Sequence, residues 1–188
     1  VYKRQVLHAA GFPNLVVSYR NDGEAPRSRS GSYALGAAEW RDVDAAVSYA
    51  LRHGAERVIL MGWSMGGAVA LQTALNSGNR DRIAGLILES PVIDWRSVLR
   101  FQARAAGMRA PLPDLAMSAL SVPLTARLSG AENAISFDSL DIVARADELK
   151  VPILILHSDD DGFVPADASH ALQPVSYTHL TLPTILLV

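Results

Sequence analysis

Residues 58–67, VILMGWSMGG, decide the fold of this chain. The stretch opens with a short apolar run, VILM, which is typical of a buried parallel strand. Small apolar residues continue as far as Leu75 and indicate a buried helix. Between the two lies Gly-x-Ser-x-Gly, centred on Ser64. The sequence therefore predicts a sharp strand-to-helix turn that pushes a serine hydroxyl out over the edge of a sheet.

The two glycines of this motif are predicted to be required by space. In so tight a turn, a Cβ at Gly62 or at Gly66 is expected to meet the neighbouring strand or helix. The expectation is therefore that neither position accepts a side chain.

Composition describes a globular chain of one-domain size. It has 188 residues, of which 49% are hydrophobic, so it can bury a real core. Its formal net charge is −2 with both signs interspersed, which gives no electrostatic case for nucleic acid or an anionic membrane as partner. The absence of cysteine excludes disulfides and sulfur-ligated metals; it suits a reducing compartment, but the localisation stays unknown. No apolar run reaches membrane-spanning length.

Both ends differ in character from the sequence between them. Residues 1–5, VYKRQ, and residues 175–188, VSYTHLTLPTILLV, resemble translated adapter sequence from transposon-based sequencing libraries. VYKRQ can be written GTG TAT AAG AGA CAG, and the reverse complement of that DNA, read from its third base, encodes Val-Ser-Tyr-Thr, the residues 175–178. We therefore expect residues 6–174 to be a partial domain flanked by two adapter-like artefacts.

Between these ends, strands alternate with helices. Strands are predicted over residues 14–19, 57–62, 82–88 and 151–157, and helices over 6–11, 39–53, 67–76 and 166–172. Residues 20–36 form a polar loop rich in Ser, Arg and Gly. The alternation predicts a single α/β domain with a parallel sheet, flanking helices and right-handed crossovers.

The alternation breaks between residues 95 and 138. Several short apolar helices are predicted there, separated by Pro111, Pro113 and Pro123. This insert comes after the strand that follows the Gly-x-Ser-x-Gly turn. It is either a lid over a site or a set of packing helices, and the sequence leaves both open. The arginines of the insert are interpreted as its solvated face; they are Arg100, Arg104, Arg109 and Arg127.

Three segments carry a resemblance to a known family. They are VILMGWSMGG at 58–67, LILESPVIDW at 86–95 and VPILILHSDDDGFVP at 151–165. Over essentially all of residues 6–174 the chain resembles the α/β-hydrolase superfamily, in its serine-hydrolase branch near prolyl oligopeptidase-like and esterase-like members. The resemblance implies the α/β-hydrolase fold, incomplete at both ends.

The third segment selects the acid of a catalytic triad. The family usually carries His-Gly-x-x-Asp-x-x-Val-Pro after a strand, and this chain keeps that register with Ser158 in place of the glycine. The register implies Asp161 as the acid, with Asp159 and Asp160 as its solvent-facing neighbours. Asp94 is the runner-up, because some hydrolases place the acid after the preceding strand.

The resemblance also assigns a nucleophile and one oxyanion donor. Ser64 is implied as the nucleophile. A serine hydroxyl becomes reactive when a histidine takes its proton, and a carboxylate supports that histidine. The backbone N–H of Met65, at the start of the following helix, is implied as a donor to the oxyanion. The second donor is expected upstream of residue 6. Neither a metal nor an organic cofactor is implied.

None of the five histidines fits the base of the triad. His8 lies in a predicted helix, His53 at a helix end, and His157 at a strand end that the family keeps for structure. His170 follows Asp161 by only nine residues, and His179 falls in the adapter-like segment. The family places this histidine about 25 to 35 residues after the acid, so we expect it to be missing from this chain.

The sequence thus predicts part of a serine hydrolase that cleaves an ester, amide or peptide bond in a small-molecule substrate through an acyl-enzyme. The alternative is a non-catalytic binding protein of the same fold, because fold alone does not establish a reaction. The sequence does not indicate the oligomeric state.

Overall fold

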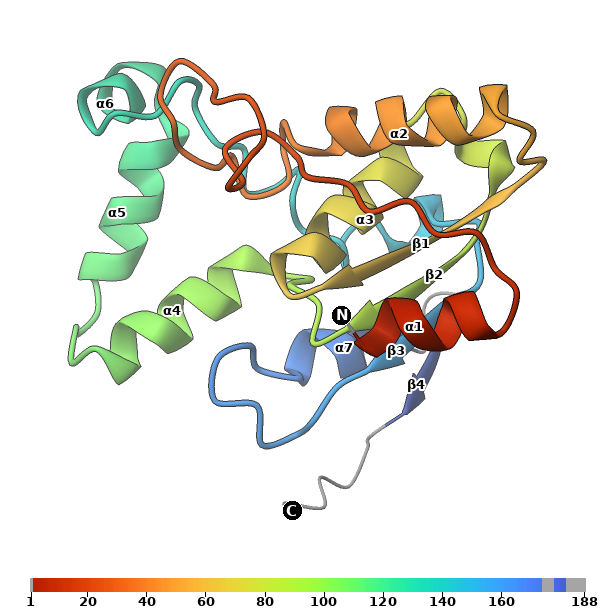
Figure 1. The fold of residues 1–188 in the computed structure, drawn as a ribbon. Helices are drawn as coiled ribbons and strands as arrows, with labels where there is room; N and C mark the ends of the chain where they lie inside the picture. The colour runs from red at the N-terminus through yellow and green to blue at the C-terminus, as the bar shows by residue number, and fades with distance from the viewer. Residues whose placement is uncertain (1, 174–177, 182–188) are drawn as a thin grey trace.

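The computed structural model describes residues 2–173 and 178–181 (Figure 1). The helices are α1 (Tyr2–Ala9), α2 (Trp40–Arg52), α3 (Met65–Asn76), α4 (Trp95–Ala105), α5 (Leu112–Ser121), α6 (Pro123–Leu128) and α7 (Asp167–Leu172). The strands are β1 (Val58–Trp63), β2 (Ile83–Glu89), β3 (Ile153–Leu156) and β4 (Thr178–Thr181). Two short 3₁₀ turns, Arg80–Arg82 and Ala146–Glu148, precede β2 and β3.

The four described strands form one parallel sheet in the order β1-β2-β3-β4. The predicted α/β class is therefore confirmed. Trp63 pairs with Glu89, and Glu89 pairs with Leu156, so the carboxyl ends of β1, β2 and β3 lie level with one another. The loops that leave these three strands start at one edge of the sheet, where α/β proteins gather their functional side chains.

Helix α3 lies at the centre of the core. Its residues from Gly67 to Leu75 are all buried, as the small apolar sequence predicted. Leu71, Leu88 and Ile155 are completely buried and belong to one cluster that joins α3 to β2 and β3. In Figure 1, α2 and α3 lie above β1, and α1 is drawn in front of β2 and β3.

Strand β1 is parallel, as predicted, but it is not buried on both faces. Val58 and Leu60 pack against the core cluster, whereas Ile59 and Met61 are 55% and 45% exposed. Successive side chains of a strand point to opposite faces, so only one face of β1 meets α3. The prediction of a buried strand is wrong for the other face, whose side chains are about half exposed.

The strand predicted over residues 14–19 is absent from the described sheet. Leu15 and Val16 are 53% and 61% exposed and lie beside Ala46 and Tyr49 of α2. An apolar, β-branched run becomes a strand only when a neighbouring strand supplies hydrogen-bond partners. Within the described residues nothing pairs with the outer edge of β1, and this segment stays irregular.

The predicted adapter-like segments overlap two described elements. Helix α1 begins within residues 1–5, and β4 lies within residues 175–188 and pairs with β3 in register, Ile153 opposite Thr178. Residues 1, 174–177 and 182–188 of the same prediction lie outside the described residues.

The polar loop of residues 20–36 is held at both ends by carboxylates of the α2 region. Arg20 donates from Nε and Nη2 to Asp42, at 2.8 Å each, and its backbone amide adds a bond of 2.9 Å. At the other end, the fully buried Glu39 accepts bonds from the amides of Ala34 and Gly36, at 2.6 and 2.9 Å. These contacts give a long connection a fixed course beside the sheet.

The Arg20 pair predicts acid-sensitive stability. Hydrogen bonds from the Arg20 side chain lower the pKa of Asp42 despite its partial burial. A depressed folded pKa contributes stability that is present above the unfolded value of about 4 and is lost as the pH falls through the folded value. Asp42→Asn is therefore expected to lower the unfolding free energy by about 1 kcal/mol at pH 6. Between pH 6 and pH 3, the unfolding free energy of this variant is expected to fall less than that of the wild type.

Urea denaturation at the two pH values measures this difference. Glu24→Gln, at an exposed position of the same loop, is the control and is expected to keep the acid dependence of the wild type. An Asp42→Asn variant that loses as much stability on acidification as the wild type would contradict the prediction.

Candidate active site

Ser64 occupies a strained turn between β1 and α3. Its φ and ψ are 53° and −119°, a region that a residue with a side chain rarely adopts. Backbone hydrogen bonds tie it to the segment after β2: Ser64 N–H donates to Glu89 O at 3.0 Å, and Val92 N–H donates to Ser64 O at 3.2 Å. This is the geometry of a nucleophile elbow, in which the turn projects the serine hydroxyl over the carboxyl edge of the sheet.

The steric prediction holds for one of the two elbow glycines and fails for the other. A Cβ on Gly62 would lie 2.3 Å from the carbonyl oxygen of Gly66, so the requirement at Gly62 is confirmed. A Cβ on Gly66 would meet nothing within 4 Å, so the prediction for Gly66 is wrong. The second crowded glycine is Gly67, whose added Cβ would lie 2.7 Å from Cβ of Pro91. The β2–α4 connection presses on Gly67, a contact between distant segments that the motif alone does not reveal.

Met65 lies at the first position of α3, directly after Ser64. The first amides of a helix have no acceptor within the helix, and the helix dipole adds partial positive charge at this end. The predicted oxyanion donor is thus adjacent to the predicted nucleophile, at the positive end of a helix of 12 residues.

Asp161 lies in the loop after β3, with its carboxylate well hydrogen-bonded and 16% exposed. One oxygen, Oδ1, accepts bonds from the amides of Phe163 and Val164, at 2.8 and 3.0 Å. Burial acts to raise the pKa of Asp161, but the two amides, the Ser90 hydroxyl and His157 outweigh it and lower the pKa. The carboxylate is therefore held ionised, the state that a triad acid needs.

The other candidate acids are engaged differently. Asp159 and Asp160 are exposed, and Asp159 pairs with Nε2 of His170 at 2.7 Å. Asp94 caps helix α4: its two oxygens accept bonds from the amides of Arg96 and Ser97, at 2.8 and 3.2 Å. This capping role accounts for the carboxylate at the runner-up position.

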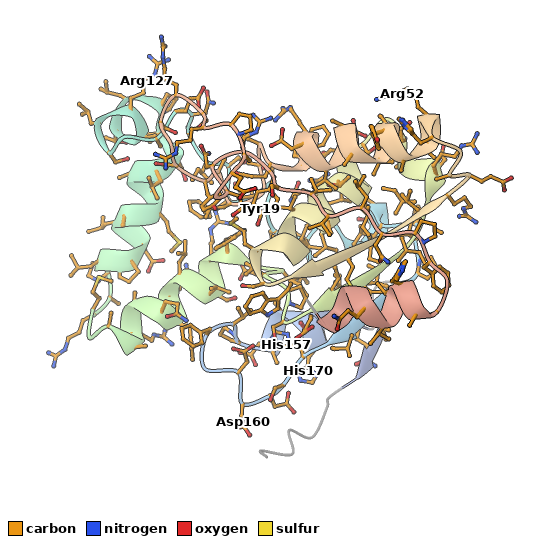
Figure 2. The ribbon with its side chains drawn as sticks, in the orientation of Figure 1. Tyr19, Arg52, Arg127, His157, Asp160 and His170 are labelled. Atoms are coloured by element: carbon orange, nitrogen blue, oxygen red, sulfur yellow. The ribbon has the colours of Figure 1, made fainter. Side chains whose placement is uncertain are left out.

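The described histidine side chains differ in their burial and in their contacts. His157 is buried, and its ring contacts Ser169 Oγ at 2.8 Å through Nδ1 and Val164 O at 2.9 Å through Nε2. His53 stacks on the Tyr49 ring and forms a hydrogen bond with the carbonyl oxygen of Tyr49, and His8 is exposed on α1. Figure 2 shows His157 and His170 close to the loop that carries Asp160. His179 lies in β4, and its side chain is outside the described residues.

His157 is expected to act in stability. Its two ring nitrogens satisfy a buried hydroxyl and a buried carbonyl, so His157→Ala leaves both without a partner and opens a cavity. The expected cost is about 3 kcal/mol of unfolding free energy, measured by chemical denaturation. His170→Ala, at a 44% exposed side chain, is the matched control and is expected to cost under about 1 kcal/mol. Equal costs in the two variants would contradict the assignment.

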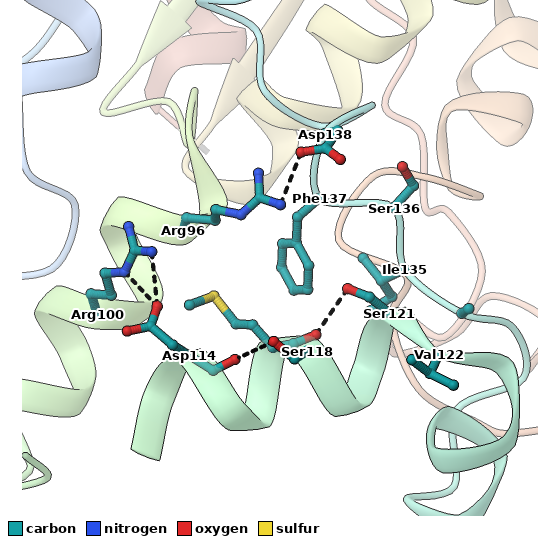
Figure 3. A pocket seen from close by; sticks show the side chains of 12 residues that line it. Arg96, Arg100, Asp114, Ser118, Ser121, Val122, Ile135, Ser136, Phe137 and Asp138 are labelled. Atoms are coloured by element: carbon teal, nitrogen blue, oxygen red, sulfur yellow. Dashed lines mark hydrogen bonds and ion pairs between the residues drawn. The ribbon is translucent and has the colours of Figure 1, made fainter. Parts of the chain in front are cut away.

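The insert encloses a cavity of its own, of about 790 Å³, between α4, α5 and residues 134–138 (Figure 3). Arg96 pairs with Asp138 at 2.9 Å, and Arg100 pairs with Asp114 at 2.8 Å, so one of the four arginines predicted as a solvated face is ion-paired. All the residues that line the cavity lie between Arg96 and Asp138. The cavity therefore belongs to the insert and not to the carboxyl edge of the sheet.

Trp95 joins the insert to the elbow helix. It packs against a cluster that contains Ala68 of α3 and Val164 of the acid loop, and against a second cluster that contains Met117 and Phe137 of the insert. Trp95 therefore connects the insert to the elbow helix and the acid loop. The two alternatives for the insert, a lid or a set of packing helices, both stay open predictions.

The described residues carry no metal cluster and no membrane-spanning helix. No group of three or more His, Asp or Glu side chains there is arranged to hold a metal ion. No helix in that part of the chain has the length and apolar character needed to cross a bilayer.

The fold has many known relatives among solved structures. A monoacylglycerol lipase from Paleococcus ferrophilus is 19% identical with a TM-score of 0.60, over 95% of this chain and 76% of its own. A lipase-esterase related protein from Clostridium acetobutylicum is 13% identical with a TM-score of 0.57, over 89% of this chain and 73% of its own. An acylaminoacyl peptidase from Pyrococcus horikoshii is 19% identical with a TM-score of 0.55, over 80% of this chain and 23% of its own.

At these identities the likeness shows the fold alone. A search of curated protein sequences finds no match. The model of one family, described as the alpha/beta hydrolase family, matches residues 4–184 and so spans the elbow, the insert and the acid loop. The chain therefore belongs to the alpha/beta hydrolase family.

Proposed function

We propose that this chain is the nucleophile and acid portion of a serine hydrolase that cleaves an ester, amide or peptide bond. The observation that carries the proposal is the left-handed Ser64 at the junction of β1 and α3, since that strain serves to expose a nucleophile. Asp161, with a lowered pKa at the same edge of the sheet, supports it. The names of the similar solved structures describe esterases, lipases and peptidases, which act on such bonds. Their activity extends to the present chain only by analogy.

The proposed reaction passes through an acyl-enzyme. Ser64 Oγ attacks the carbonyl carbon of the substrate while a histidine takes the hydroxyl proton, and the N–H of Met65 donates to the oxyanion that forms. The histidine then gives that proton to the leaving alcohol or amine as the carbonyl–heteroatom bond breaks. Water, activated by the same histidine, hydrolyses the acyl-enzyme and returns the proton to Ser64. Asp161 orients the histidine and stabilises its charged form.

The base is proposed to lie in sequence outside residues 6–174. Among the described histidines, only His157 contacts Asp161, at 3.7 Å between Nε2 and Oδ2, and both of its ring nitrogens are occupied. In keeping with the adapter-like character of residues 1–5 and 175–188, we propose that a longer parent protein supplies the base and the second oxyanion donor.

Three measurements test these proposals. The 188-residue chain is expected to turn over p-nitrophenyl esters hardly at all, and turnover that disappears in Ser64→Ala would show that a base is present after all. In the gene of the parent, a histidine codon is expected 20 to 40 codons after that of Asp161, and the parent protein is expected to react with a fluorophosphonate probe. A parent with neither property would favour the second candidate, a non-catalytic binding protein, which the engaged histidines of this chain also favour.

A further inference from the structure

We infer that Gln102, on helix α4 of the insert, is a positioning residue that holds the loop carrying Asp161. The inference rests on the proposed function of Asp161 as the acid of a triad. Gln102 Nε2 donates a hydrogen bond to Phe163 O at 2.6 Å, across 61 residues of sequence. Gln102 lies outside the segments that indicate the elbow and the acid loop, so only the fold brings it to this place.

One face of α4 is turned toward the acid loop. Trp95, Val98 and Gln102 are spaced i, i+3 and i+7, so their side chains lie on the same side of the helix. Val98 and Val164 are 7% and 6% exposed and belong to one buried cluster, against which Trp95 packs. Gln102, one turn further along, reaches the neighbouring residue Phe163. This face therefore combines apolar packing with a hydrogen bond.

The start of α4 is fixed relative to the nucleophile elbow. Val92 N–H donates to Ser64 O at 3.2 Å, two residues before the helix cap. The cap itself is Asp94, whose carboxylate accepts from the amides of Arg96 and Ser97. Helix α4 thus begins at a segment that is bonded to the elbow and ends beside the acid loop, above which it lies in Figure 1.

The residues that α4 contacts are those that hold the carboxylate. Asp161 Oδ1 accepts from the amides of Phe163 and Val164, at 2.8 and 3.0 Å. Val164 is buried, and its carbonyl oxygen also contacts the ring of His157 at 2.9 Å. Phe163 is 75% exposed, so side-chain packing does little to fix it. The bond from Gln102 is therefore expected to matter most for the amide of Phe163.

Loss of this bond is expected to act locally. A hydrogen bond near the surface competes with water, so its net contribution is modest, and the acid loop can open without unfolding of the domain. When a donor to Asp161 fluctuates, the carboxylate presents a less fixed oxygen to the base. The consequence for a parent enzyme is a lower kcat with little change in KM, because substrate contacts are not altered.

The test is amide hydrogen exchange, measured by NMR in the ¹⁵N-labelled 188-residue chain. Gln102→Met keeps the length and the helix propensity of the side chain but has no donor. The Phe163 amide is expected to exchange roughly three- to tenfold faster in this variant, and the Val164 amide is expected to change less. Arg104→Met is the matched control at an exposed position of the same helix and should keep the wild-type rates.

Two results would overturn the inference. One is an unchanged exchange rate of the Phe163 amide in Gln102→Met. The other is an equal acceleration at Val98 within α4, because that would indicate general destabilisation and no specific hold on the acid loop.

Exchange requires no turnover, so its outcome is independent of the fluorophosphonate reaction that tests Ser64 in the parent. Faster exchange at Phe163 with a parent that does not react would uphold the contact and refute the proposed function. Unchanged exchange with a reactive parent would overturn the inference and leave the proposed function in place.

Discussion

Ser64→Ala in the proposed parent enzyme is expected to lower kcat on the order of 10⁵- to 10⁶-fold. The variant lacks the only atom that forms the acyl-enzyme, so binding and oxyanion stabilisation alone remain. Ser64 is half-buried at the elbow, and loss of its hydroxyl leaves the Glu89 and Val92 backbone bonds in place. The variant should therefore fold normally and bind substrate with little change in KM. Steady-state ester hydrolysis and labelling with a fluorophosphonate measure the loss.

A matched pair of acid variants controls this result. Asp161→Asn is expected to reduce kcat by roughly 10⁴-fold, because an amide cannot hold the base in the required tautomer. Asp159→Asn, two residues away on the same loop, removes only an exposed pair with His170 and is expected to leave kcat nearly unchanged. If Asp159→Asn were the damaging substitution, the register that selects Asp161 would be wrong. Retention of activity in Ser64→Ala would disprove the acyl-enzyme itself.

Gly62→Ala is expected to destabilise the fold by about 3 kcal/mol, near the upper end of the usual range for overpacking. Its new Cβ would lie 2.3 Å from Gly66 O and 2.6 Å from Gly67 N, and both are backbone atoms. Backbone atoms cannot rotate out of the way as a flexible side chain can, so the elbow must open. Thermal or chemical unfolding of the chain measures the loss.

Gly66→Ala is the control within the same motif. Nothing lies within 4 Å of the added Cβ, and alanine is the better helix former inside α3. We expect unchanged stability or a gain of roughly 0.5 to 1 kcal/mol. A larger loss of stability for Gly66→Ala than for Gly62→Ala would show that Gly66, and not Gly62, is the crowded position of the elbow.

The elements that the sequence predicted well are those with strong local signals. Helix α2 was predicted over 39–53 and occupies Trp40–Arg52, and the strands at 82–88 and 151–157 occupy Ile83–Glu89 and Ile153–Leu156. The helix periodicity ends at Gly54, and the two apolar runs end at Glu89 and at His157. The family segments also placed the elbow and the acid loop after strands, and the structure has these loops leave β1 and β3, whose carboxyl ends lie level on either side of β2.

The predictions that were wrong depended on contacts between distant segments. Residues 14–19 have the composition of a strand, but a strand needs a partner, which local sequence cannot supply. Ile59 and Met61 are apolar, yet about half of each side chain is exposed. The crowding at Gly67 comes from Pro91, 24 residues further along, and the spacing Gly-x-Ser-x-Gly does not contain it.

The sequence by itself determined the parallel α/β class and the position of a strained serine turn. It could do so because side-chain periodicity and the steric demands of glycine act within a few residues. The tertiary structure alone decided that Asp94 caps a helix and that both ring nitrogens of His157 are hydrogen-bonded inside the core. Each of these depends on which atoms lie within about 3 Å after the chain has folded, and hydrogen bonds over that distance join residues of separate strands and loops.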